Sequence, residues 1–243
     1  MSNKQFFLFI AAVFAAFFGW LYYDSSVSTD SVSHENVQRD VLLDANAPGE
    51  GAQIKYLFNF PDVVYDHAHS PGEIEALSEK SGQAENYHIE GLTDAQFGLK
   101  TLYKFNYNKK IFQNTYLLWV EDLRVDFSYT TVNVYISNQY PEGGCEYQAT
   151  MDHENTHVQI HRRIYEKYQK ILQDVISSST DIPLVNHPVT VQSLEDGKAI
   201  ISQLISGVTD PVFNQFQQEL SQEQGELDSP ASYAELQSRC SHW

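Results

Sequence analysis

The chain has 243 residues, of which 42% are hydrophobic and 19% charged. That length is enough to bury the core of one fair-sized domain with appendages. Its 15 Lys and Arg against 32 Asp and Glu leave a net charge of -17, which argues against a nucleic-acid partner and disfavours attraction to anionic lipid headgroups. Two cysteines exclude Cys-rich zinc modules and disulfide-dense miniproteins.

The N-terminus carries an uncharged apolar run over residues 6–23, which ends in the aromatic sequence WLYY. A spanning helix needs roughly 20 apolar residues, with about 17 as the lower limit, and aromatic residues are typical of its interfacial end. We predict a membrane anchor over residues 1–23; the alternative is a signal peptide cleaved after Ala15. Both interpretations export the rest of the chain, either anchored to a membrane or, after cleavage, as a secreted protein.

The remainder divides into a linker and one domain. Residues 24–53 are acidic and Ser-rich with little apolar periodicity, which predicts a disordered linker. Residues 54–243 contain strand patterns first and helix patterns afterwards, which predicts an α+β fold.

The first part of this domain has the patterns of a sheet. Four stretches are predicted to be strands: 53–67, 84–91, 115–130 and 131–137. Ser70-Pro71 is a capped start with Pro at the first helical position, which predicts a short helix. The apolar stretch 97–107 fits either a strand or the end of a helix that begins at Thr93.

The second part has helical patterns. Residues 145–177 contain no Pro or Gly, and their apolar residues recur at helical spacing, which predicts one long helix. Residues 181–188 are predicted to be a loop. Two further helices are predicted over 193–206 and 211–224, with Asp210 capping the second.

The long helix carries the motif His-Glu-x-x-His at positions 153–157. Side chains four apart lie on one helix face, so His153 and His157 can bind one Zn²⁺ ion and leave a position open for water. Glu154 can then accept a proton from that water as it attacks a carbonyl. The motif therefore predicts zinc-dependent hydrolysis; the alternative is a pair of histidines on a helix surface.

A third histidine follows one turn later. The ends of the series from His153 to His161 are separated by about 12 Å of helix rise, so they cannot easily share one ion. We therefore place His161 behind the ligands or on the surface. The third ligand of metzincins would fall at Arg163, which excludes that class.

Several stretches occur in an order that resembles a bacterial family of exported, zinc-peptidase-like proteins still classed as a domain of unknown function. They are NYHIEGLT, NTYLLWVEDLRVDFSYTTVNVYIS and MDHENTHVQIHRRI, and the similarity covers roughly residues 85–243. The resemblance implies metal-binding roles for His153 and His157 and catalysis by Glu154. The C-terminal family pattern of an aromatic-Asp pair, a Thr and a His-Gly matches poorly, because this chain has Leu227-Asp228 and a tyrosine, Tyr233, in place of the His.

Cys145 and Cys240 lie in the exported part, where an oxidising compartment favours a disulfide; two buried free thiols are the alternative. Such a bridge would draw the C-terminal tail toward the metal helix. It would favour a third ligand in the tail over His187 and Glu195.

We predict Asp228 as that ligand and Tyr233 as the residue that stabilises the oxyanion. Pro230 is expected to end helical structure and leave a short rigid segment after Asp228. The family's aromatic-Asp pair aligns there as well. Glu223 and Glu226 are the other tail candidates, and Asp228 can also be read as a cap of the turn at Ser229-Pro230.

Together these features predict a zinc metallopeptidase of the cell envelope, of zincin type, that acts on a peptide or protein and contacts the membrane through its N-terminal helix. Two alternatives remain open at this point. One is an envelope protein that holds zinc for binding or assembly without turnover. The other is an amidase that acts on cell-wall peptides with the same metal core.

Overall fold

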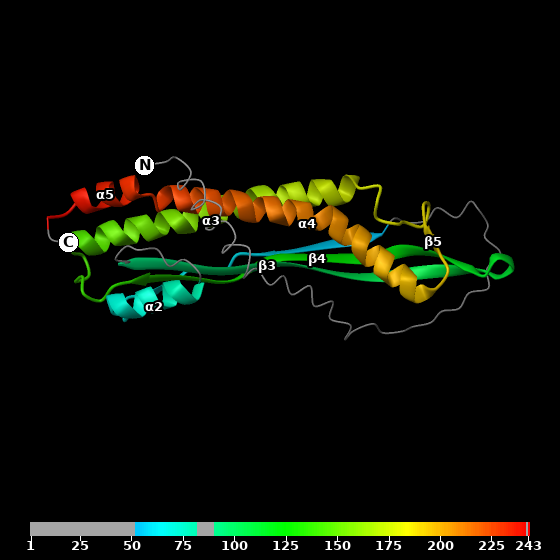
Figure 1. Cartoon of the computed structure of the whole chain (residues 1–243), viewed down its shortest axis with the longest axis horizontal. Coiled ribbons are helices and arrows are strands. Elements are labelled where there is room, and N and C mark those ends of the chain that lie inside the picture. The colour runs from blue at the N-terminus through cyan, green and yellow to red at the C-terminus, as the bar shows by residue number, and fades with distance from the viewer. Residues whose placement is uncertain (1–51, 82–89, 242) are drawn as a thin grey trace, which may run out of the picture. The chain divides into compact units, whose positions relative to one another are not determined.

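A computed structural model describes residues 52–81, 90–241 and 243 (Figure 1). The expected membrane anchor, nearly all of the linker and most of the predicted strand at 84–91 lie outside these residues. Within them, no helix has the length and apolar character that crossing a bilayer requires.

One long hairpin forms the centre of the sheet. Strand β3 (Gly91–Lys110) pairs antiparallel with β4 (Thr115–Ile136) from end to end, through the 3-10 turn η1 (Ile111–Gln113). Asn114 closes this turn in the left-handed conformation, with φ 46°, which Asn tolerates better than most residues. The stretch 97–107, for which strand and helix were both open, is therefore strand.

Because β3 occupies one edge of β4 along its whole length, the remaining strands share the other edge. In order along β4 they are β5 (Val189–Val191), β1 (Gln53–Asn59) and β2 (Val64–Asp66). Strands β1 and β2 run parallel to β4, and β5 runs antiparallel. The single strand expected over 53–67 is thus two strands, and β5 follows the predicted loop without having been predicted.

The hairpin has two irregularities, and the one at Thr130 explains why the pattern of β4 read as two strands. The pairing with β3 skips Glu121 and Thr130, one residue at each register shift. An extra residue reverses the face to which later side chains point. The buried positions accordingly change phase along β4, in the order Leu118, Val120, Leu123, Val125, Phe127, Tyr129, Val132, Val134 and Ile136.

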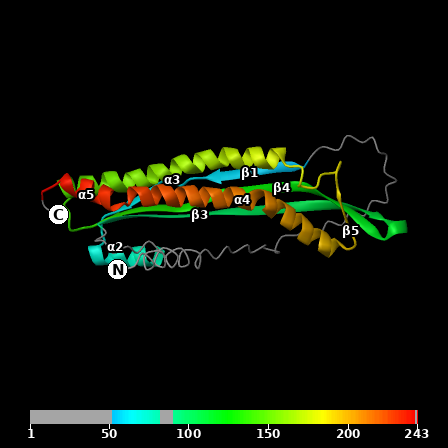
Figure 2. The same cartoon turned by 45° about the horizontal axis from the view of Figure 1, so that its top comes forward.

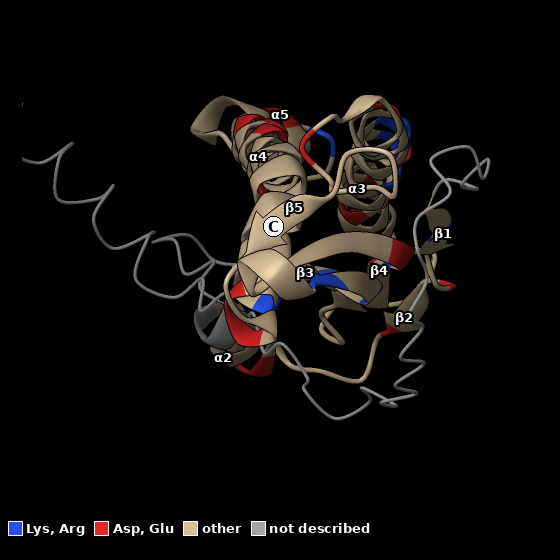
Figure 3. Ribbon diagram, turned by 90° about the vertical axis from the view of Figure 1, so that its right-hand side faces the viewer, with Lys and Arg blue, Asp and Glu red and all other residues tan. Residues whose placement is uncertain are grey.

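The described residues contain four α-helices: α2 (Pro71–Ser81), α3 (Cys145–Ser178), α4 (Leu194–Leu227) and α5 (Pro230–Ser238). Helices α3 and α4 lie side by side on one face of the sheet, and α2 lies toward the opposite face (Figures 2 and 3). The apolar faces of α3 and α4 and the buried positions of β4 form one core. The α+β fold, the start of α2 at Pro71 and the long helix α3 are confirmed.

The prediction of two helices separated near Asp210 was wrong, because α4 continues through Pro211. Proline cannot donate a hydrogen bond to the carbonyl one turn earlier, and helices bend at such positions. Figure 1 shows α4 changing direction along its length. Val208, Val212 and Phe213 are buried on both sides of the proline, so packing against the sheet holds the helix together.

Pro230 was expected to end helical structure, but it begins a helix instead. It occupies the first turn of α5, where its missing N–H has no intrahelical partner to lose, and the Ser229 side chain accepts a hydrogen bond from the Ser232 amide. Asp228 therefore lies at the junction between two helices, as the C-terminal cap of α4.

Candidate metal centre

The histidines of the motif lie on the buried face of α3. His153, Glu154 and His157 are each less than 8% exposed, although all three are polar. Buried polar groups need partners, because burial without a hydrogen bond or a counter-charge is costly. This excludes the interpretation of His153 and His157 as surface histidines.

Asp228 meets both histidines at one point. Its Oδ1 lies 3.2 Å from Nε2 of His153 and 3.0 Å from Nε2 of His157, and the two Nε2 atoms are 3.1 Å apart. The three atoms thus form a nearly equilateral triangle. In the described part of the chain, these are the residues whose donor atoms could together hold a metal ion.

Hydrogen bonds alone satisfy this triangle poorly. Each Nε2 carries at most one proton, and a carboxylate oxygen only accepts. If both rings are protonated at Nε2, both can donate to Asp228, but their N–H groups then face each other. If one of the two rings carries no proton on Nε2, the lone pair of that nitrogen faces the carboxylate. A cation bound by all three atoms removes the conflict.

The size of the triangle fits zinc. Zinc binds nitrogen and carboxylate oxygen at about 2.0–2.2 Å in tetrahedral sites, which separates neighbouring ligand atoms by roughly 3.3–3.6 Å. The observed sides of 3.0–3.2 Å are only slightly shorter. Two imidazoles, one carboxylate and an open fourth position form the ligand set of hydrolytic zinc sites.

Antiparallel packing of α4 on α3 brings Asp228 to the histidines. Arg163 pairs with Glu223, and Lys167 pairs with Glu219, so one turn forward on α3 matches one turn back on α4. Continuing this register toward the start of α3 places the end of α4 beside the motif.

The other candidate ligands point elsewhere in the described structure. Glu223 forms the ion pair with Arg163, Glu226 accepts from Gln222, Glu195 pairs with Lys198, and His187 Nδ1 accepts from the Leu184 amide. The structure therefore brings Asp228, and none of these residues, to the histidines.

Glu154 lies beside the triangle and is held by β3. Thr93 donates its hydroxyl proton to Glu154 Oε2 at 2.8 Å and to the Glu154 carbonyl at 3.2 Å. Burial raises the pKa of the Glu154 carboxyl, and the nearby charges of His157 and His153 oppose that shift. A carboxylate with a raised pKa is a better proton acceptor near neutral pH than an exposed one.

Gly91 allows this close approach of β3 to α3. A Cβ atom there would lie 2.6 Å from Thr150 Cγ2 and 2.7 Å from Glu154 Oε1. Gly91→Ala should therefore cost about 1–3 kcal/mol of unfolding free energy, since buried atoms must shift. Gly98→Ala on the same strand is the matched control, because no atom lies within 4 Å of its Cβ position. Equal urea midpoints for the two variants would contradict this packing.

Gln224 of α4 fixes the orientation of His157. Its amide nitrogen donates to the His157 carbonyl at 3.3 Å, so its oxygen faces Nδ1 of the same residue and accepts a hydrogen bond from the Nδ1–H group. In the neutral ring this leaves the Nε2 lone pair directed into the triangle. Gln224 could not be recognised as a site residue from the sequence, because its role depends on the packing of α4.

His157 and Asp228 each stabilise the charged form of the other. Burial alone would lower the pKa of His157, but the hydrogen bond to Asp228 and the charges of Glu154 and Asp228 outweigh it and raise that pKa to about 9. Burial opposes ionisation of Asp228, yet its hydrogen bonds to His153 and His157 hold the pKa of its carboxyl far below the usual range. The site thus favours an anionic carboxylate with positive charge beside it.

His161 is buried and lies behind the ligands, outside the triangle. Its Nδ1 and the Tyr129 hydroxyl are 2.9 Å apart. Burial, with a smaller effect from the charge of His157, lowers the pKa of His161 from 6.5 to about 4. The neutral ring is therefore the form that the fold accommodates.

This depressed pKa predicts a stability change in acid. In unfolded chains His161 takes up a proton as the pH falls below 6.5, whereas in folded chains it does so only near pH 4. The contribution of His161 to the free energy of unfolding is therefore fully present above pH 6.5 and is lost as the pH falls toward 4. The loss should approach roughly 3 kcal/mol by pH 4. Urea unfolding of His161→Gln should show a shallower decline over this window than the unaltered chain; parallel curves would contradict the assignment.

Tyr233 of α5 lies at the edge of the triangle. Its hydroxyl donates to Asp228 Oδ1 at 3.2 Å, and its ring centroid is 5.4 Å from that of His153. The hydroxyl thus lies beside the ligand atoms, where it could also reach a substrate oxygen.

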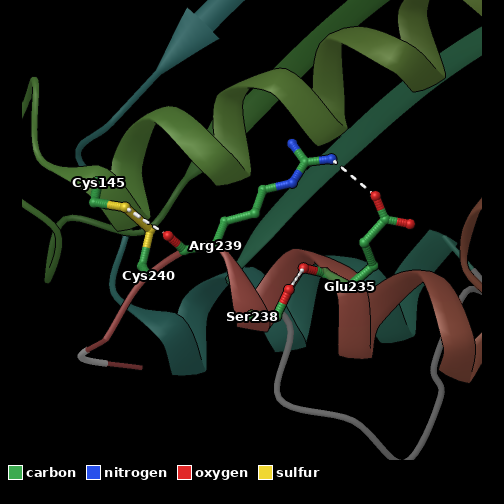
Figure 4. Close-up of a disulfide and its surroundings, with 5 residues drawn as sticks. All are labelled: Cys145, Glu235, Ser238, Arg239 and Cys240. Carbon is green, nitrogen blue, oxygen red and sulfur yellow. Dashed lines mark hydrogen bonds and ion pairs between the residues drawn. A yellow bond between two sulfur atoms is a disulfide. The ribbon is translucent and has the colours of Figure 1, made fainter.

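The Cys145–Cys240 disulfide is present and joins the first residue of α3 to the chain just after α5 (Figure 4). An ion pair between Arg239 and Glu235, and a hydrogen bond from the Ser238 hydroxyl to the Glu235 carbonyl, complete this end of α5. The bridge thereby restrains the segment that carries Asp228 and Tyr233 against the motif helix.

Replacing both cysteines, Cys145→Ser with Cys240→Ser, should lower the unfolding free energy by up to roughly 4–5 kcal/mol, because the bridge closes a loop of 95 residues. The affinity for zinc should fall as well, because the segment that carries Asp228 is no longer restrained against the motif helix. Urea unfolding and zinc titration of the two proteins measure the effects. An unchanged midpoint would show that the bridge does not restrain the fold.

Comparison with known proteins adds no relative: no family model, no curated protein and no solved structure matches the chain. The functional interpretation therefore depends on the geometry of the site.

Proposed function

We propose that the chain is a zinc-dependent peptidase of the cell envelope, with the metal held by His153, His157 and Asp228. The observation that carries the proposal is the triangle of three metal-ligating atoms, which a cation satisfies better than protons do. A zinc ion in this position would lower the pKa of a bound water and polarise a carbonyl.

The chain's own groups have complementary roles in this proposal. Glu154 accepts the proton of the attacking water and later passes it to the leaving amine, and Thr93 holds the carboxylate in place. The Tyr233 hydroxyl, which donates to Asp228 Oδ1 in this structure, would turn to the oxygen on which negative charge develops. Burial of His153, Glu154 and His157 limits water access and strengthens each of these interactions.

The sheet supports an extended peptide as substrate. In the described residues, β3 has a strand partner on one side only, namely β4. Gly91 and Thr93, near the start of β3, contact or hydrogen-bond Glu154. A peptide that paired with the other edge of β3 would pass close to the proton acceptor, and such strand addition is a common mode of peptide recognition.

The test is cleavage of an unbiased peptide mixture by the full chain in detergent, with mass spectrometry of the products. Cleavage should be lost after treatment with a chelator, return with added zinc, and be absent from His153→Ala. A zinc-loaded chain that releases no fragments would contradict peptidase activity and favour a zinc-holding role without turnover.

A further inference from the structure

The tip of the β3–β4 hairpin carries the two most exposed large apolar side chains of the described residues. Ile111 is 71% exposed, and Phe112 is 103% exposed. Figures 1 and 2 both show this tip extending beyond the helices and β5. Ile111 and Phe112 therefore project from the end of the domain with no part of the described fold around them.

The same tip is basic, although the whole chain has a net charge of -17. Between Asp94 and Glu121 the charged residues are four lysines and no acid: Lys100, Lys104, Lys109 and Lys110. Lys104 pairs with Asp122, whereas Lys109 lies over the Tyr116 ring at 5.6 Å. Figure 3 looks at the molecule from the end that carries the tip.

The N-terminal part of the chain joins the domain toward this same end. Because β1 is parallel to β4 and Gln53 pairs with Asp122, the chain enters β1 from the side of the tip and runs away from it. Gln53 is therefore roughly 23 Å along β4 from the end of the hairpin. Residues 24–51 could span up to about 95 Å, so a membrane-held run at 6–23 leaves the tip within reach of the same bilayer.

We propose that this tip, residues 109–112, inserts into an anionic lipid bilayer. Ile111 and Phe112 enter the boundary between headgroups and acyl chains, and Lys109 and Lys110 bind lipid phosphates. Apolar side chains flanked by basic ones are the combination that interfacial membrane binding requires. The net charge of the chain hides this local basic surface, which is why composition alone disfavoured it.

Insertion of the tip would hold the metal centre away from the membrane. Gly91, which lies against Glu154, is at the other end of the hairpin, opposite Ile136. The 22 residues of β4 separate the two ends by roughly 70 Å. The proposal does not depend on the metal or on peptidase activity, and its test is separate from theirs.

The test uses the full chain in vesicles of phosphatidylglycerol mixed with brominated phosphatidylcholine, whose acyl chains quench tryptophan. Phe112→Trp reports on the tip. Val64→Trp is the matched control, because Val64 is also exposed but pairs with Asn133, roughly 60 Å along β4 from the tip. The emission of the unaltered chain, which contains three Trp, is subtracted from both.

We expect the added emission of Phe112→Trp to be quenched and that of Val64→Trp to be unaffected. Adding Lys109→Gln and Lys110→Gln should lower the ratio of inserted to free tip about thirtyfold, since each ammonium group near an anionic surface is worth about fivefold. Equal quenching at the two positions, or quenching that persists without the lysines, would overturn the proposal. A tip that stays unquenched would overturn it as well.

Discussion

Glu154→Gln should lower peptide turnover by about 10²–10⁴ while zinc content and fold stay the same. The substitution keeps the shape of the side chain and its contact with Thr93 but removes the basic carboxylate oxygen. Turnover of a cleaved peptide and zinc per chain, measured on the same preparation, give the two quantities.

Thr93→Val is the useful companion variant, because it removes the hydroxyl that holds Glu154 and leaves the carboxylate. Its turnover should fall less than that of Glu154→Gln. If Glu154→Gln turned over peptide at the unaltered rate, another group would have to accept the proton, and Glu154 would have no part in the reaction.

Asp228→Ala should weaken zinc binding at least about tenfold, because it removes one of three ligand atoms; losing even a group that only supports a ligand typically costs 10–100-fold. Glu226→Ala is the matched control. Glu226 is a carboxylate on the last turn of the same helix, and it contacts Gln222 rather than the triangle. Competition with a chromogenic chelator measures both affinities.

Gln224→Ala should weaken zinc binding by less than Asp228→Ala but more than Glu226→Ala, since it leaves the three ligands and removes the group that orients His157.

A larger loss of zinc affinity in Glu226→Ala than in Asp228→Ala would show that Asp228 is not the third ligand.

The helix that carries the motif could be predicted from the sequence because its signals are local. The absence of Pro and Gly and the helical spacing of apolar residues determine α3, whose observed bounds are Cys145–Ser178. The spacing of His153 and His157 places both on one face of any helix. Their approach to each other follows from local structure and needed no knowledge of the fold.

The features that were mispredicted depend on contacts between distant segments. The sequence around Pro211 shows a helix breaker, but the burial of Val208 and Phe213 against the sheet keeps α4 continuous. The same holds at Thr130, where β4 shows a break in alternation that is an irregularity in pairing rather than the end of a strand. Local patterns indicate where regularity fails but not whether packing bridges the gap.

The residues of the candidate site also fall into two groups, those that could be named from the sequence and those that could not. Asp228 and Tyr233 were named from the tail, and the structure places both at the histidines. Gly91, Thr93 and Gln224 were not named as site residues, because their roles arise only when β3 and α4 pack beside the motif helix. In a single sequence, nothing distinguishes a glycine that will lie against a buried carboxylate from any other glycine.

The most direct measurement is the zinc content of the purified full chain after exposure to excess zinc and removal of unbound metal. Elemental analysis should find about one zinc per chain, and His153→Ala and His157→Ala should each retain almost none, because a site with three ligands loses most of its affinity with one of them. Folded chain without zinc above background, or with zinc that both variants retain, would contradict the assignment of His153, His157 and Asp228 as a metal centre.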